Sequence, residues 1–215
     1  MRDRYEAQLR ESNRALVELG ELCEKAITLA IEAFLSSKKE LIEQVKQIEI
    51  EIDESEKRIE RDCLNLLLMQ HPIATDLRVV SAALKMITDL ERIGDQAADI
   101  AYLTKYTDGT TDDSNIKEMT TAVIKMVKNA VDSYVNRDLQ LAKEVIEYDD
   151  VIDDLFLAVK ADTVKAMQVG VAGTRGEGVL DVFMIAKYLE RIGDHATNVA
   201  EWVEFSITGH HKDNN

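Results

Sequence analysis

One sequence of six residues, LERIGD, occurs twice in this chain of 215 residues, at Leu90–Asp95 and at Leu189–Asp194. The two copies lie 99 residues apart, within longer patterns that also match. At an offset of 100 residues, one set of apolar positions aligns with a second set: Phe34, Leu41, Val45, Ile52 and Ile59 with Tyr134, Leu141, Val145, Ile152 and Val159. This long-period similarity indicates an internal duplication, so we expect two copies of one structural unit.

Apolar residues in the chain recur every three to four positions, which is the period of an amphipathic helix. The first helix carries the stripe Leu9, Leu16, Leu19, Cys23, Ala26, Ala30 and Ala33, and the second carries Leu41, Val45, Ile48, Ile52, Ile59 and Leu66. The third runs from Leu77 to about Leu103, after a break at His71-Pro72. One proline and nine glycines in the whole chain also favour long helices over a sheet with many turns.

Helices of about 30 residues would be about 45 Å long, and three of them joined by short turns pack as an up-down-up bundle. The predicted fold is therefore all-α, with two tandem three-helix bundles related by a pseudo-twofold duplication. One continuous six-helix bundle is the alternative. We place the first unit at residues 1–106, a linker (TDGTTDDSN) at 107–115, the second unit at 116–207 and a flexible polar tail at 208–215.

The formal net charge is −15, from 26 basic and 41 acidic residues. Such a surface repels nucleic-acid phosphates and anionic lipid, so we expect no nucleic-acid partner and membrane proximity only through other proteins. The charged segment Met1–Ser12 does not fit a signal peptide, and no apolar run is long enough for a membrane helix. The predicted location is cytoplasmic. Cys23 and Cys63 lie on apolar stripes and are interpreted as core thiols.

Four acidic pairs with i,i+4 spacing fall at matched positions of the two copies: Glu49/Asp53 with Asp149/Asp153 on the second helix, and Glu91/Asp95 with Glu190/Asp194 on the third. Residues four apart share one helical face, so ladders on neighbouring helices would offer four carboxylates each. Such cages suit hard cations. Asp99 extends the first ladder, and Asn198 is its counterpart in the second. All ten residues are candidate metal ligands.

The salt-bridge alternative is that Arg92 and Arg191 neutralise these ladders within the protein. Gly94 and Gly193 interrupt helices at a cost of about 1 kcal/mol each, either for close helix packing or for clearance around ions. No histidine follows a glutamate at the Glu-x-x-His spacing of di-iron bundles. A glycine-rich phosphate loop and a nucleophile set are also missing from the sequence, which argues against an enzyme.

The duplicated unit with LERIGD, the acidic pairs and HPIATDLR at His71–Arg78 resembles the PhoU family of phosphate-transport regulatory proteins, from about Tyr5 to Phe205. The resemblance implies multinuclear metal clusters on the acidic motifs, with iron, zinc, manganese or magnesium as candidate ions. It also implies a homodimer. The implied function is negative regulation of phosphate uptake and of the phosphate-starvation response. The implied partners are the ATPase subunit of a phosphate ABC transporter and a sensor histidine kinase.

The chain departs from the family pattern at Val169–Gly178, where the second copy has VGVAGTRGEG in place of HPIATDLR. Asn198 in place of an aspartate implies that the two metal sites differ. Two other functions stay open at this point. One is a metal-dependent hydrolase or oxidase that uses the carboxylate clusters to activate water. The other is a purely structural helical scaffold.

Overall fold

The computed structural model describes residues 2–69, 74–105, 114–169 and 176–210. These residues form six helices: α1 (Arg2–Ser36), α2 (Lys39–Met69), α3 (Ala74–Leu103), α4 (Ser114–Asn136), α5 (Leu139–Val169) and α6 (Gly176–Thr208). The break at His71-Pro72 and most of the predicted linker, residues 107–113, lie outside the described residues. Ser114 and Asn115, which we assigned to the linker, already belong to α4.

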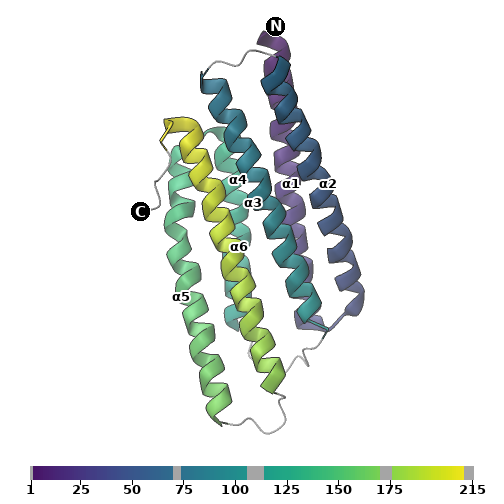
Figure 1. Ribbon diagram of the computed structural model, residues 1–215. Helices are drawn as coiled ribbons and strands as arrows, with labels where there is room; N and C mark the ends of the chain where they lie inside the picture. Colours follow the sequence, from purple (N-terminus) through teal and green to yellow (C-terminus); the bar gives the residue numbers. More distant parts are fainter. Residues whose placement is uncertain (1, 70–73, 106–113, 170–175, 211–215) are drawn as a thin grey trace.

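Helices α1–α3 form one half of the molecule and α4–α6 the other (Figure 1). The halves meet where α3 packs against α6 and α1 against α4, while α2 and α5 lie at opposite outer edges. The all-α, duplicated fold is confirmed. Buried residues of both halves belong to a single hydrophobic cluster, so the two three-helix units share one continuous core.

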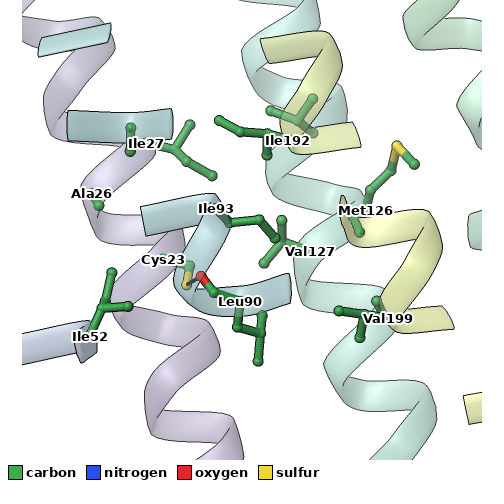
Figure 2. Packing of buried hydrophobic residues seen from close by; sticks show 14 of the residues in the cluster. Cys23, Ala26, Ile27, Ile52, Leu90, Ile93, Met126, Val127, Ile192 and Val199 are labelled. Carbon is green, nitrogen blue, oxygen red and sulfur yellow. Dashed lines mark hydrogen bonds between the residues drawn. The ribbon is translucent and has the colours of Figure 1, made fainter. Parts of the chain in front are cut away.

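The apolar stripes read from the sequence form this core. Figure 2 shows Cys23, Ile52 and Leu90 packed with side chains of the second repeat nearby, and the Cys23 thiol donates a 3.2 Å hydrogen bond to the Leu90 carbonyl. Cys23 and Cys63 are both free and buried, as expected for core thiols. Burial raises the pKa of the Cys23 thiol, which keeps it protonated and unreactive.

The duplication extends to the conformation of the turns. Ser37 between α1 and α2, and Arg137 between α4 and α5, both have φ of 54°. After Arg137, the Asp138 amide donates to the Ser133 carbonyl at 2.8 Å, which closes α4 in a Schellman arrangement. The Asp138 side chain then accepts a 3.0 Å hydrogen bond from the Leu141 amide and caps α5. Short, defined turns of this kind hold the neighbouring helices antiparallel.

The start of α3 lies against the end of α6. Gly209 has φ of 80°, and its amide donates to the Phe205 carbonyl at 2.8 Å. A Cβ atom at Gly209 would collide with the guanidinium of Arg78, the last residue of the HPIATDLR segment. That segment therefore has one end in the contact between the repeats, while His71, Pro72 and Ile73 lie outside the described residues.

Candidate functional site

The first acidic ladder brings three carboxylates together. Glu49 and Asp53 of α2 and Asp95 of α3 each offer an oxygen, and these atoms all lie within 4.8 Å of one another. All three side chains are partly buried. A group of three anionic oxygen donors fits a hard cation and is the only such acidic group among the described residues.

Burial and mutual repulsion make this cluster electrostatically unfavourable by itself. The pKa of Glu49 is raised, first by loss of solvation and then by Asp53 and Asp95. The pKa of Glu91, one turn before Asp95, is raised by burial and then by Asp95. A bound cation would relieve both effects, because it replaces lost solvation and separates like charges.

Cationic side chains already compensate part of the charge. Arg92 lies 3.0 Å from Asp95 through Nη1 and Oδ2, and 3.4 Å from Glu91 through Nε and Oε2. Lys57 lies 3.4 Å from Asp53. The salt-bridge alternative is therefore partly realised at the first ladder. Glu49 takes part in none of these pairs, and its carboxylate points into the cluster with Asp53 and Asp95.

The second ladder has the same four positions but a different arrangement. Burial raises the pKa of Asp149 to about 6, with smaller contributions from Asp194 and Asp153. Glu190 is held by Lys187, whose ammonium lies 2.6 and 2.5 Å from its two oxygens.

The four carboxylates of the second ladder are thus close enough to repel one another. The compact three-carboxylate geometry, however, occurs in the described residues only at the first ladder.

Asp99 and Asn198 lie at the contact between α3 and α6. Burial and, after it, the nearby Asp95 raise the pKa of Asp99, while a hydrogen bond with Tyr188 and the nearby Arg191 oppose the rise. Asn198 donates a 3.2 Å hydrogen bond to Asp89, so its side chain joins the two repeats. The ligand roles of both residues stay predictions.

Asp89 is a residue that our reading of the sequence missed. Its Oδ1 atom lies 2.9 Å from Nδ1 of His195 as well as 3.2 Å from Nδ2 of Asn198. A signal was present, because Asp89 and Tyr188 directly precede the two LERIGD copies at matched positions. A carboxylate at this position in one copy and a phenol in the other indicate that both residues make polar contacts, each with a different partner.

The two glycines of the LERIGD copies face isoleucines of the neighbouring helix. A Cβ atom at Gly94 would lie 2.8 Å from Cδ1 of Ile52, and one at Gly193 would lie 3.3 Å from Cγ2 of Ile152. The close-packing explanation therefore holds at Gly94. At Gly193, the added Cβ would also lie 3.4 Å from an Asp149 oxygen, so this glycine brings the backbone of α6 close to the second ladder.

The PhoU domain model matches the chain twice, at residues 16–104 and 116–203. The chain belongs to the PhoU family. Each match lies within one three-helix repeat, so the chain consists of two PhoU domains in tandem. Among the described residues, none of the helices combines the length and apolar character that crossing a membrane requires.

Relatives with the same family name match along almost the whole chain. A phosphate-specific transport system accessory protein PhoU homolog from Clostridium acetobutylicum is 35% identical over 215 residues, which is 98% of this chain and 97% of that protein. The crystal structure of PhoU from Pseudomonas aeruginosa has a TM-score of 0.88 at 30% identity and covers 96% of this chain and 100% of its own. The PhoU structure from Streptococcus pneumoniae shares the fold, with a TM-score of 0.90 at 23% identity, covering 97% and 99%.

Proposed function

We propose that this PhoU-family protein is an accessory and regulatory protein of a phosphate-specific transport system. The observation that carries the proposal is the double PhoU match over both repeats, together with relatives of the same length that bear this name. These relatives are named as accessory or regulatory proteins and not as enzymes.

In more detail, the proposal is that the protein is a negative regulator of phosphate uptake and of the phosphate-starvation response. It acts in the cytoplasm as a homodimeric adaptor between the ATPase subunit of a phosphate ABC transporter and a sensor histidine kinase. The long helical surface supports an adaptor role, because outer helices α2 and α5 leave extended faces free of intramolecular helix contacts within the described chain.

Deletion of the gene tests the regulatory role. We expect phosphate-starvation genes to be expressed in high phosphate when the protein is absent, and to be repressed again when it is restored. Expression that stays repressed in the deletion strain would contradict a negative regulator. Copurification tests the two partners: the ATPase subunit and the kinase should each be recovered with the tagged protein when all three proteins are expressed at comparable levels.

The acidic ladders are the proposed metal centres, with the first built on Glu49, Asp53, Glu91 and Asp95 and the second on Asp149, Asp153, Glu190 and Asp194. A bound cation would supply charge neutralisation between α2 and α3 and between α5 and α6, and so would stiffen the surfaces that partners contact. The convergence of three carboxylates at the first ladder supports this role.

Metal content measured by mass spectrometry tests the centres. We expect several equivalents of metal per chain in protein purified without chelator, and a large loss in an Asp95→Asn/Asp194→Asn variant. A metal-free, folded wild-type protein would favour the scaffold alternative, with the ladders held by Arg92 and other cations. Phosphoester turnover that disappears with Asp95→Asn would favour the hydrolase.

A further inference from the structure

A groove of about 310 Å³ lies between α4 and α5 in the second repeat, and we call it the α4–α5 groove. Its lining includes the buried Met126 and Val145, the ring of Tyr148, and the exposed side chains of Lys125, Glu144 and Glu147. The described residues that line it do not belong to the second acidic ladder. An apolar floor with a few polar groups around it is the usual composition of a ligand pocket, and this volume lies in the range of such pockets.

The groove already accommodates a cation of the protein itself. The ammonium of Lys125 lies 4.4 Å from the centroid of the Tyr148 ring, which is a cation–π contact. Within the described chain, Lys125 forms no ion pair with Glu144 or Glu147, and Glu144 accepts a 3.1 Å hydrogen bond from the Gln140 amide. The groove therefore combines a ring that binds a cation with two carboxylates that Lys125 does not neutralise by direct contact.

Two other lysines nearby do not change this balance. Lys143 on α5 is exposed and does not line the groove. Lys128 on α4 lies near Glu24 of α1, on the side of α4 that faces the first repeat. Among the described residues, Lys125 is thus the only cation that lines the groove, against the two carboxylates.

The first repeat shows that the fold does not require these side chains. The groove residues suited to a cation have neutral, non-aromatic counterparts at an offset of 100 residues: Gln44 for Glu144, Gln47 for Glu147 and Ile48 for Tyr148. One matched position gains a carboxylate instead, Glu51 in place of Val151, and Glu51 lines a different groove together with Arg61. Because α1 and α2 form the same helix pair with the neutral residues, helix packing does not explain the acidic and aromatic residues of the second repeat.

We propose that the α4–α5 groove receives an arginine side chain of a partner protein, and that Lys125 occupies the groove until the guanidinium of the partner displaces its ammonium. A planar guanidinium stacks on a tyrosine ring and donates two hydrogen bonds to a carboxylate, while its aliphatic stem packs on apolar side chains. The groove offers all three contacts, through Tyr148, the two glutamates and its apolar floor. The inference rests on the proposed function, because it describes a contact by which an adaptor of this kind holds a partner.

Position and charge favour this occupant. Glu144 and Glu147 are exposed and three residues apart on one side of α5, so an arginine on the surface of another protein can reach both. Arginine and tyrosine are enriched among the residues that contribute most to protein interfaces. A second copy of this chain would bring its own net charge of −15 to the same surface, which opposes association. Displacement of Lys125 costs little, because a cation–π contact at an exposed site is weak.

Titration of the full-length protein with an isolated side chain tests the recognition chemistry. The probe is N-acetyl-arginine amide, with N-acetyl-citrulline amide as its neutral counterpart, and NMR shifts of the backbone amides report where each one binds. The variants Tyr148→Ile and Glu144→Gln/Glu147→Gln introduce the residues of the first repeat, which forms the same helix pair with them. Glu40→Gln/Glu43→Gln is the matched control, because it removes two exposed glutamates with the same spacing from α2.

We expect the arginine probe to shift the amide signals of the groove with equal affinity in the wild type and in Glu40→Gln/Glu43→Gln. Glu144→Gln/Glu147→Gln should bind it about tenfold more weakly, and Tyr148→Ile about two- to fivefold more weakly. The citrulline probe should bind the wild type more weakly than the arginine probe does. Equal binding by the wild type and Glu144→Gln/Glu147→Gln overturns the proposal, and so does an equal loss in Glu40→Gln/Glu43→Gln, which would indicate general attraction to an acidic surface.

Removal of the resident lysine tests the displacement. Lys125→Ala should bind the arginine probe more tightly than the wild type, because no ammonium has to leave the ring. Lys25→Ala removes the same charge at the matched, exposed position of the first repeat and should bind as the wild type does. Equal affinity of the two variants overturns the displacement by Lys125.

Two further measurements test the other occupants. If 1,4-diaminobutane binds the groove more tightly than the arginine probe, the occupant is a free amine and the proposal is overturned. If Glu144→Gln/Glu147→Gln abolishes self-association in sedimentation experiments, the occupant is a second copy of the chain, which also overturns it.

Complementation of the deletion strain separates this inference from the proposed function. If the wild-type protein and Glu40→Gln/Glu43→Gln restore repression in high phosphate while Glu144→Gln/Glu147→Gln, at equal protein level, does not, a partner contact at the groove is supported. If Glu144→Gln/Glu147→Gln restores full repression, the partner contact is overturned and the regulatory function stands. If the deletion itself leaves the genes repressed, the regulatory function fails, and the titration decides whether the groove binds arginine.

Discussion

Asn198 of α6 donates a hydrogen bond to Asp89 of α3, with 3.2 Å between Nδ2 and Oδ1. At an offset of 99 residues, Asp89 matches Tyr188 and Asn198 matches Asp99. Tyr188 and Asp99 are also hydrogen-bonded to each other. The duplication has therefore produced one contact twice across the α3–α6 interface, with the carboxylate on α3 in both cases. The contact fixes the register of the two central helices and hence of the two repeats.

The change Asp89→Ala should destabilise the protein by about 1–3 kcal/mol, because it removes the acceptor shared by His195 and Asn198 at a mostly buried position. Urea denaturation followed by circular dichroism measures the free energy of unfolding. The control Tyr188→Phe removes the matched hydrogen bond but leaves the ring, and should cost about 1 kcal/mol. Unchanged stability in Asp89→Ala would show that the contact between the repeats does not depend on this carboxylate.

The two LERIGD glycines should respond differently to alanine. In Gly94→Ala, the new Cβ lies 2.8 Å from Cδ1 of Ile52, which is fully buried, so we expect a loss of about 1–3 kcal/mol from overpacking, partly offset by higher helix propensity. In Gly193→Ala, the nearest carbon is 3.3 Å away, and the loss should be smaller. Thermal unfolding of both variants checks the order. A larger loss for Gly193→Ala would be inconsistent with the packing described.

Stability should depend on pH through Asp149. Its pKa is raised to about 6 in the folded state from a usual value of 3.8, so between these values the folded protein binds more protons than the unfolded chain. The contribution of this group to stability therefore falls as the pH rises through that window and is lowest above about pH 6. Urea denaturation of chelator-treated protein at several pH values measures this dependence.

The change Asp149→Asn removes the ionisable group and should raise the free energy of unfolding near neutral pH while flattening the fall between about pH 4 and pH 6. Asp150→Asn, at an exposed position next to it, is the matched control and should retain the wild-type profile. A profile of Asp149→Asn that overlays the wild type would mean that folding does not raise the pKa of Asp149.

The sequence predicted the helices and the core because both depend on local periodicity. Residues such as Cys23 and Ile52 belong to apolar stripes at helical spacing, and such a stripe can be buried against any neighbouring helix. The duplicated LERIGD copies also placed the third helix of each repeat correctly. Contacts between helices far apart in sequence, such as Asp89 with His195, depend on helix rotation and register, which periodicity leaves undetermined.

The i,i+4 spacing of the acidic residues also could not predict how the two ladders differ. Lys187 holds Glu190, whereas the matched residue of the first repeat, Thr88, donates a hydrogen bond to the Leu84 carbonyl instead. The i,i+4 spacing is the same in the two ladders, but one changed residue beside the second ladder holds one of its carboxylates. Only the side-chain arrangement shows this effect.

Metal binding should therefore be unequal between the ladders. Asp53→Asn removes one of three converging carboxylates and should lower the affinity for Mn²⁺ strongly, because the charge and the number of oxygen ligands both fall. Asp153→Asn should have a smaller effect, since Lys187 holds Glu190 and no group of three converging carboxylates is found among the described residues of the second ladder. Calorimetric titration of chelator-treated protein measures both affinities, with Glu43→Gln at an exposed position of α2 as the control.

The change Lys187→Thr tests the reason for that inequality, because it gives the second repeat the residue that the first repeat has at the matched position. Without the ammonium, Glu190 is free to turn toward Asp149 and Asp194, so the second ladder should bind Mn²⁺ more tightly than in the wild type. The affinity of the first ladder should not change, since Lys187 contacts only the second repeat in the interactions found for it. Weaker binding at the second ladder after this change would indicate that Lys187 supports the site rather than competing with the metal.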